Sequence, residues 1–273
     1  MTNLLNHDID GYQLAYLHSG AGTPLLLVHG SMSDYRSWAL QMEAFPGYSV
    51  HAVSLRHCYP ERWNGHGDGF SIARHAHDLA AFILGVLGGS AHVVGHSRGG
   101  AVVLQLALDQ PALVRSLVLA DPGGLDALLP DTEDGRRMAS EGSRMFDRLR
   151  DDLATGNVDE AARRFVEALS GPGAWERRTL QQRQVLLDNI TTGPACADRP
   201  SFPQGALAAL QPPTLLVTGE RSPRRYALML AALQSCCPQA RDLITVPDAA
   251  HAMQRDNAHA FNDAVAVFLS TAV

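Results

Sequence analysis

Residues 91–104 read AHVVGHSRGGAVVL, and this stretch decides the fold. Ala91–Val94 is a short apolar run typical of a buried strand, and Gly100–Leu104 continues as an apolar helical pattern. Between them, Gly95–Gly99 has the form G-x-S-x-G. Its two glycines let a strand and a helix approach closely around a sharp turn, which strains the backbone of Ser97 and exposes its hydroxyl. The stretch therefore predicts a strand, a tight turn and a helix, with Ser97 as a candidate nucleophile.

Length and composition restrict the class of protein. The 273 residues, 46% of them hydrophobic, are enough to bury one large core. A net charge of −6 with interspersed signs predicts no nucleic-acid partner. No apolar run reaches the roughly 18 residues of a membrane span, so no membrane partner is expected. The first ten residues lack a basic region followed by an apolar stretch, so no signal peptide is expected.

The cysteines favour a reduced chain in the cytoplasm. None has CxxC spacing and two are adjacent, which does not suit a disulfide framework. They are Cys58, Cys196, Cys236 and Cys237. Nothing in the sequence indicates an oligomeric state.

Short apolar runs alternate with longer helical patterns, which is typical of a parallel sheet with crossover helices. The expected strands are Leu14–Leu17, Pro24–Val28, Ser49–Ser54, Ala91–Val94, Ser116–Ala120, Thr214–Thr218 and Leu243–Val246. The expected helices are Ser37–Phe45, Ile72–Leu87, Gly99–Asp109, Arg225–Cys236 and Asn257–Leu269. Ser71 is a candidate N-cap, because its hydroxyl can accept a hydrogen bond from an amide in the first turn.

One segment interrupts this alternation. Residues 122–210 contain only helical patterns, at Arg136–Leu153, Asp159–Leu169 and Arg177–Ile190. An insertion after one strand predicts a helical cap over the carboxyl edge of the sheet, where open α/β sheets bind ligands. The expected core is then 1–121 with 211–273. A second, independent helical domain is the alternative. The cap is favoured because the helices are short and are inserted between two expected strands of the same sheet.

Taken in order, these pieces resemble the α/β-hydrolase family over nearly the whole chain. The matching segments are Leu25–Gly30, Gly95–Gly99, Pro213–Gly219 and Ala250–Met253. The resemblance implies an α/β fold, a mostly parallel sheet flanked by helices with an inserted helical cap. It also implies a small-molecule substrate and no cofactor. Because Ser97 rather than an aspartate occupies the turn, chemistry like that of haloalkane dehalogenases or epoxide hydrolases is disfavoured.

His251 is the candidate base. It lies on a loop between the last expected strand and the last expected helix, from which a histidine can reach the hydroxyl of Ser97. The resemblance assigns His29 and His96 to packing. His75 and His77 are two residues apart on a helix and point to different faces, so they make a poor metal pair and no metal is expected.

The resemblance also implies an oxyanion hole of two backbone amides, those of Ser31 and Arg98, with Met32 as an alternative donor. Such fixed donors stabilise charge as it develops. For the Arg98 side chain two interpretations are open: it reaches the pocket and favours a carboxylate- or carbonyl-rich substrate, or it forms a structural ion pair. Possible substrate-lining residues are Met32, Tyr35, Arg36 and Trp38, although Tyr35, Arg36 and Trp38 also suit the start of a helix.

The position of the acid departs from the commoner pattern. Many relatives carry the acid three residues after the glycine that ends the late strand, and here that position holds Ser222. Some haloalkane dehalogenases carry it instead at the end of the strand after the elbow helix. Asp121 stands there, 24 residues after Ser97 (121 − 97). Asp121 is therefore the expected acid and Glu220 the possible alternative, while a capping role for Asp121 also remains open.

The sequence predicts a cytoplasmic, cofactor-free serine hydrolase that cleaves a carboxylic ester or lactone through an acyl-enzyme. A carbon–carbon bond hydrolase, or an amidase or aminopeptidase, is an alternative with the same triad. A non-hydrolytic lyase, oxygenase or receptor is an alternative of another class, because fold does not determine function. Turnover of p-nitrophenyl esters separates these classes.

Overall fold

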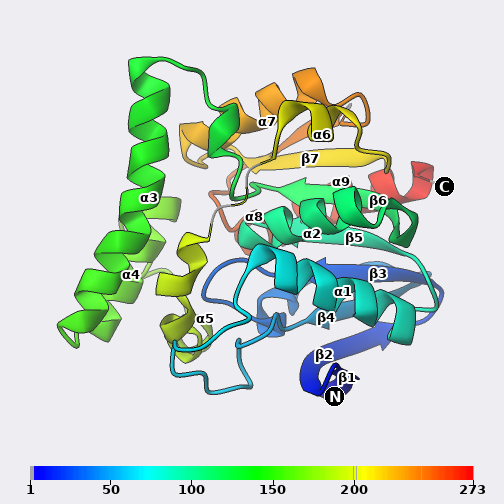
Figure 1. Ribbon diagram of the computed structural model, residues 1–273, viewed down its shortest axis with the longest axis horizontal. Coiled ribbons are helices and arrows are strands. Elements are labelled where there is room, and N and C mark those ends of the chain that lie inside the picture. Colours follow the sequence, from blue (N-terminus) through cyan, green and yellow to red (C-terminus); the bar gives the residue numbers. More distant parts are fainter. Residues whose placement is uncertain (1–2, 199, 201, 241, 273) are drawn as a thin grey trace.

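A computed structural model describes residues 3–198, 200, 202–240 and 242–272. Eight strands form one sheet in the order β1-β2-β4-β3-β5-β6-β7-β8 (Figure 1). Their bounds are Leu5–Ile9, Tyr12–Gly20, Thr23–Val28, Tyr48–Val53, Ala91–His96, Val114–Ala120, Thr214–Gly219 and Asp242–Val246 for β1 to β8. β1 pairs antiparallel with β2, and β2 with β4, while all other pairs are parallel. The mostly parallel sheet predicted from the alternation is confirmed.

The two faces of the sheet carry two separate cores. Successive side chains of a strand point to opposite faces, and β3 shows this directly. Leu26 and Val28 join one cluster with residues of α1 (Ile72–Val86), α2 (Arg98–Asp109) and α7 (Arg224–Cys236). Leu25 and Leu27 join the other, with residues of the 3₁₀ helix Tyr35–Trp38, α8 (Met253–Asp256) and α9 (Ala258–Thr271). Helices thus cover both faces, and Figure 1 shows α1 and α2 side by side over the sheet.

Two local predictions differ from the structure. Strand β1 was not expected, because its sequence LNHDI is mostly exposed and has no alternating apolar pattern. The helix expected at Ser37–Phe45 is instead the 3₁₀ helix Tyr35–Trp38 followed by turns. The Asp34 carboxylate accepts from the Arg36 amide and so favours a tight turn, and Pro46 disfavours helical geometry at the residue before it. The Ser71 cap is confirmed, since its hydroxyl accepts from the Arg74 amide at 3.1 Å.

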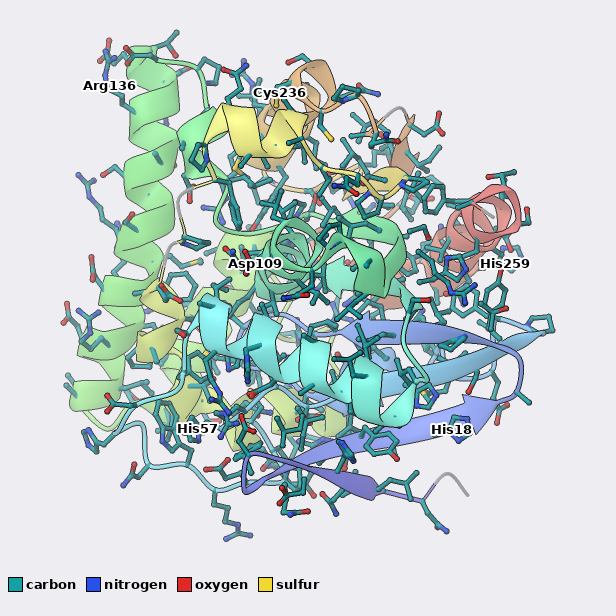
Figure 2. The ribbon with its side chains drawn as sticks, turned by 45° about the vertical axis from the view of Figure 1, so that its right-hand side comes forward. His18, His57, Asp109, Arg136, Cys236 and His259 are labelled. Atoms are coloured by element: carbon teal, nitrogen blue, oxygen red, sulfur yellow. The ribbon has the colours of Figure 1, made fainter. Side chains whose placement is uncertain are left out.

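Between β6 and β7 lies a helical segment, and no strand occurs in it over 122–198, 200 and 202–210. Its α-helices are α3 (Glu133–Ala154), α4 (Val158–Ser170), α5 (Leu180–Asp188) and α6 (Gln204–Ala208). α3 and α4 lie together at one side of the sheet (Figure 1) and pack through Phe146 and Phe165, whose ring centroids are 5.8 Å apart. The outer face of α3 is charged, and Arg136 points away from the protein (Figure 2).

The division into a core (1–121 and 211–273) and a cap (122–210) stays a prediction. Residues 1, 2, 199, 201, 241 and 273, which it includes, lie outside the described residues. In the described ranges, no helix combines the length and apolarity needed to cross a membrane.

Candidate active site

Ser97 occupies a strained turn between β5 and α2. Its φ of 53° and ψ of −121° lie in a region that residues with a Cβ rarely adopt. Backbone hydrogen bonds hold the turn: the Ser97 amide donates to the Ala120 carbonyl at 2.9 Å, and the Ser97 carbonyl accepts from Gly123 at 2.8 Å and Gly100 at 2.9 Å. The neighbouring strand β6 and the loop after it therefore fix the conformation that projects the Ser97 side chain.

The glycines of the turn are required by close approach. A Cβ on Gly95 would overlap the Val103 side chain and the Gly99 carbonyl. A Cβ on Gly99 would overlap the backbone carbonyls of Val28 and His29 at the end of β3. The G-x-S-x-G pattern thus packs the first turn of α2 directly against strands β5 and β3.

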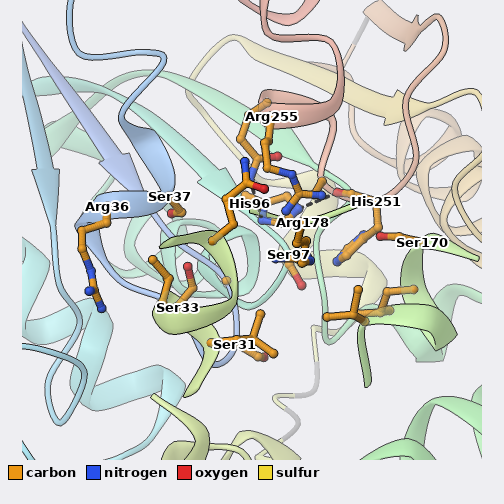
Figure 3. Close-up of a pocket in the computed structure, with 18 of the residues that line it drawn as sticks. Ser31, Ser33, Arg36, Ser37, His96, Ser97, Ser170, Arg178, His251 and Arg255 are labelled. Carbon is orange, nitrogen blue, oxygen red and sulfur yellow. Dashed lines mark hydrogen bonds between the residues drawn. The ribbon is translucent and has the colours of Figure 1, made fainter. Parts of the chain in front are cut away.

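His251 lies on the loop after β8 and borders the same cavity as Ser97 (Figure 3). Its Nδ1 is 3.2 Å from Oδ2 of Asp121. The His96 ring lies 2.7 Å, through Nε2, from the His251 carbonyl, and the Tyr226 ring stacks on the imidazole at 4.6 Å between centroids. The remaining ring nitrogen, Nε2, is buried and has no hydrogen-bond partner in the described part of the chain. It is therefore free to exchange a proton with a group in the cavity.

Asp121 directly follows strand β6 and is fully buried. Besides facing His251, its Oδ2 accepts a 2.6 Å hydrogen bond from the hydroxyl of Ser222. Burial raises the pKa of Asp121 to about 7, against the lowering effect of the Ser222 hydrogen bond. Burial also lowers the pKa of His251 to about 3, and the positive charge of Arg225 adds to this. His251 is accordingly a neutral imidazole at neutral pH, the form that a general base requires.

Glu220, the alternative acid, lies elsewhere. Its side chain is exposed and accepts a 2.9 Å hydrogen bond from the Asp248 amide. The structure thus brings Asp121, not Glu220, to His251. Sequence reasoning did not assign a role to Ser222, although a hydroxyl at the usual acid position was the signal that this residue faces the site.

The loop after β3 lies against the turn of Ser97. His29 fixes this loop through two contacts: Nε2 accepts from the Leu55 amide at 2.9 Å, and Nδ1 lies 2.8 Å from the Gly30 carbonyl. A Cβ on Gly30 would come 2.9 Å from the Cβ of Ser97. Ser31, the next residue, lines the cavity beside Ser97, and the Arg98 amide is in the first turn of α2, where amides have no intrahelical acceptor. The two predicted oxyanion residues therefore flank Ser97.

Of the residues predicted to line the site, Arg36 borders this cavity, whereas Met32, Tyr35 and Trp38 lie outside its wall. Trp38 is fully buried against Phe261, with ring centroids 6.3 Å apart. Tyr35 is buried in the same core, and Met32 lies in the other one. The physical reason is that the 3₁₀ helix turns its aromatic face to the sheet, so its polar residues Arg36 and Ser37 border the cavity, together with Ser33 from the loop before the helix.

The Arg98 side chain is 5% exposed; Arg98 borders a small second cavity beside Ser97 and not the large one. Its guanidinium carbon lies 4.7 Å from the centroid of the Phe70 ring, and Nη2 is 3.8 Å from Oδ2 of Asp198. Asp198 also accepts a 2.7 Å hydrogen bond from the Ile72 amide at the start of α1. These contacts favour the structural interpretation of Arg98, which links α2 to the helical segment.

A cavity of about 370 Å³ opens above Ser97 and His251. Its far wall comes from the helical segment, including Phe165, Leu169 and Gln182. Three arginines border it, Arg36, Arg178 and Arg255 (Figure 3), and sequence reasoning missed the last two. Within the described ranges, no three His, Cys, Asp or Glu side chains are grouped so that they could hold a metal ion.

Comparison with known sequences and structures finds hydrolases in both cases. The sequence model described as "Alpha/beta hydrolase family" matches residues 25–264. A hydrolase from Pseudomonas aeruginosa PA01 is 25% identical, with a TM-score of 0.74 over 98% of each chain. A thermophilic esterase from Thermogutta terrifontis is 24% identical, with a TM-score of 0.74 over 100% of this chain and 99% of that one.

One curated relative matches over less than two thirds of its own length. The dihydrolipoyllysine-residue acetyltransferase component of the acetoin cleaving system of Cupriavidus necator is 34% identical over 125 residues, which is 43% of this chain and 31% of that protein. The matched region thus spans about a third of the length of that relative.

Proposed function

The chain belongs to the alpha/beta hydrolase family, and from this premise we propose that it is a serine hydrolase that cleaves a carboxylic ester or lactone of a small molecule through an acyl-enzyme. One observation carries the proposal. The strained Ser97 and the unpartnered Nε2 of His251 border one cavity, while Nδ1 of the same ring faces the buried carboxylate of Asp121. Nucleophile, base and orienting acid are the three groups that acyl transfer to a serine requires.

In the first half of the proposed reaction, Oγ of Ser97 attacks the carbonyl carbon while Nε2 of His251 takes the hydroxyl proton. The carbonyl oxygen becomes negatively charged and accepts hydrogen bonds from the amides of Ser31 and Arg98. A donor of this kind contributes on the order of 3–4 kcal/mol to transition-state stabilisation. The tetrahedral intermediate then collapses, and the leaving oxygen takes the proton from Nε2 as the alcohol departs.

In the second half, a water molecule attacks the acyl group on Ser97, and His251 takes the water proton. The second intermediate collapses to the carboxylic acid, and the proton returns to Oγ. Asp121 accepts the Nδ1–H hydrogen bond throughout, which fixes the tautomer and stabilises the imidazolium. The His96 contact to the His251 carbonyl holds the loop in register with Asp121. The reaction needs only these groups and water.

Two measurements test the proposal. The wild-type protein should hydrolyse p-nitrophenyl acetate and butyrate, and Ser97→Ala should lose on the order of 10⁴ or more in kcat with an unchanged circular-dichroism spectrum. A fluorophosphonate ester should add covalently to one peptide, the one that contains Ser97, by mass spectrometry. Retention of more than a tenth of the activity in Ser97→Ala would reject the mechanism. Absence of both turnover and labelling would favour a receptor or lyase.

A further inference from the structure

The large cavity has an excess of positive charge. Three arginines border it, Arg36, Arg178 and Arg255, and no Asp or Glu does so among the described residues. This is unexpected in a chain with 28 acidic and 22 basic residues and a net charge of −6. A concave site with one sign of charge attracts ligands of the other sign.

Two of these arginines are already paired within the protein. Nη2 of Arg36 lies 2.7 Å from Oδ2 of Asp34 and 2.8 Å from Oδ2 of Asp188. Nη2 of Arg255 lies 2.7 Å from Oδ1 of Asp256. Their charges are therefore largely compensated, and they are held in place by their own carboxylates.

Arg178 differs from both. It has no ion pair with any described residue, and its Nε is buried without an acceptor. Burial lowers the pKa of Arg178 to about 9, the charge of Arg255 acts in the same direction, and the charge of Asp256 opposes both. The rest of the side chain is partly exposed, but Nε has lost its hydration without gaining an acceptor, and a buried donor in that state is costly. A carboxylate from a ligand supplies that partner in the bidentate geometry that arginine favours.

Arg178 lies close to the candidate catalytic groups. Its charge is near enough to lower the pKa of His251, after the larger effects of burial and Arg225. Arg178, Ser97 and His251 border the same cavity, and Figure 3 labels Arg36 apart from the other three. An anion on Arg178 would therefore be part of a molecule that also reaches Ser97.

Ser97 borders two cavities, and His251 borders one of them and not the other. The large cavity is bordered by His251, while a second cavity of about 50 Å³ is bordered by Ser97, Arg98 and Tyr226 but not by His251. The general acid must reach the leaving oxygen. The leaving alcohol consequently occupies the His251 side, the large cavity, and the acyl group occupies the small one.

We propose that the substrate is a short-chain acyl ester of a hydroxy acid, whose carboxylate pairs with Arg178 in the large cavity. The inference rests on the proposed serine hydrolase function. Arg178 acts in binding and specificity, and the size of the second cavity limits the acyl group to a few carbon atoms.

The test compares 4-acetoxybenzoate with 4-acetoxybenzamide, which share the acyl group and the ring and differ in charge. The ratio of their kcat/KM values should favour the benzoate in the wild-type protein. In Arg178→Gln this ratio should fall about 10- to 100-fold, as expected for loss of a charge-assisted hydrogen-bond pair. Arg178→Lys should recover part of it. Arg177→Gln is the matched control, because Arg177 is the exposed neighbour outside the cavity wall, and it should keep the wild-type ratio.

Two results would overturn the proposal: an unchanged ratio in Arg178→Gln, or a wild-type protein that does not favour the benzoate. A second pair, mono-p-nitrophenyl succinate and p-nitrophenyl butyrate, places the charge on the acyl side. If Arg178→Gln changes the ratio of this pair and not of the first, the assignment of the carboxylate to the leaving alcohol is wrong.

Binding separates this inference from the proposed function. Calorimetric titration of Ser97→Ala with 4-acetoxybenzoate should give binding that Ser97→Ala/Arg178→Gln loses. If this dependence is found but no ester is hydrolysed by the wild-type protein, the anion site stands and the hydrolase proposal fails. If esters are hydrolysed but binding does not depend on Arg178, the hydrolase proposal stands and the anion site fails.

Discussion

The hydroxyl of Ser222 donates a 2.6 Å hydrogen bond to Oδ2 of Asp121, the carboxylate oxygen that lies 3.2 Å from Nδ1 of His251. Ser222 stands where many relatives carry the acid itself. In this chain the carboxylate is therefore supplied by the residue after strand β6. The position after β7, where many relatives have the acid, supplies a hydroxyl that stabilises the charge of that carboxylate. The Ser222 hydroxyl is itself oriented by the Gly219 amide, which donates to it at 3.2 Å.

This relationship predicts the pH dependence of turnover. The active form needs neutral His251 and ionised Asp121, and burial raises the pKa of Asp121 to about 7. Deprotonation of Asp121 proceeds as pH rises, so kcat/KM for a neutral ester should rise through about pH 7 and level off above it. In Ser222→Ala the lowering effect of the hydrogen bond is lost, so the acid limb should move to higher pH by about one to two pH units.

The measurement is a kcat/KM profile from pH 5 to 10 with p-nitrophenyl butyrate. Ser235→Ala is the control, because the hydroxyl of this exposed serine donates to the Ala232 carbonyl of its own helix, far from the site. If the acid limb of the profile lies at the same pH in Ser222→Ala and in the wild-type protein, the hydrogen bond from Ser222 does not lower the pKa of Asp121.

The identity of the acid gives a second prediction. Asp121→Asn keeps the shape of the side chain but removes the charge that stabilises the imidazolium, so kcat should fall by roughly 10⁴. Glu220→Gln should lose less than about tenfold, because Glu220 contacts the Asp248 amide at the surface and not His251. Both variants are measured with p-nitrophenyl esters and checked by thermal unfolding. A larger loss in Glu220→Gln would reverse the assignment.

Local patterns in the sequence predicted the turn of Ser97 and the core strands, because each depends on a short segment and on the parallel order of the sheet. The assignment of Asp121 as the acid beside His251 came instead from the resemblance to α/β hydrolases, and its catalytic role stays a prediction. The contact between Ser222 and Asp121 joins residues 101 positions apart, and Arg178 enters the cavity from the helical segment, so neither follows from a local pattern. Trp38 was misassigned because one turn of 3₁₀ helix decides whether an aromatic ring faces the core or the cavity.

The Arg98 side chain provides a third prediction. Arg98→Met keeps an apolar stem and removes the guanidinium, which lies over the Phe70 ring and 3.8 Å from the 37%-exposed carboxylate of Asp198. An ion pair of this kind contributes little, so the free energy of unfolding should change by less than about 1 kcal/mol. The ratio of kcat/KM for 4-acetoxybenzoate and 4-acetoxybenzamide should stay at its wild-type value, because the side chain lies outside the large cavity. A fall in that ratio would instead support the interpretation in which the Arg98 side chain binds the substrate.

The close packing of α2 on β3 gives the last prediction. In Gly99→Ala the new Cβ would overlap the carbonyls of Val28 and His29, which are backbone atoms and cannot rotate away. Overpacking of this kind costs about 1–3 kcal/mol, more than alanine gains over glycine in a helix. Gly205→Ala is the matched control, since nothing lies within 4 Å of its added Cβ, and it should be neutral or slightly stabilising. Urea unfolding measures both changes.

The same substitution should reduce turnover, because the displaced backbone leads directly into Gly30 and Ser31. A shift of the Ser31 amide weakens one of the two proposed oxyanion donors, and the loss of a whole donor costs on the order of 3–4 kcal/mol. We therefore expect Gly99→Ala to lower kcat for p-nitrophenyl butyrate by tenfold or more under conditions where the protein remains folded, and Gly205→Ala to keep it. Full activity in a destabilised Gly99→Ala would mean that the loop moves without Ser31, and the amide of Met32 would then become the better candidate for the second donor.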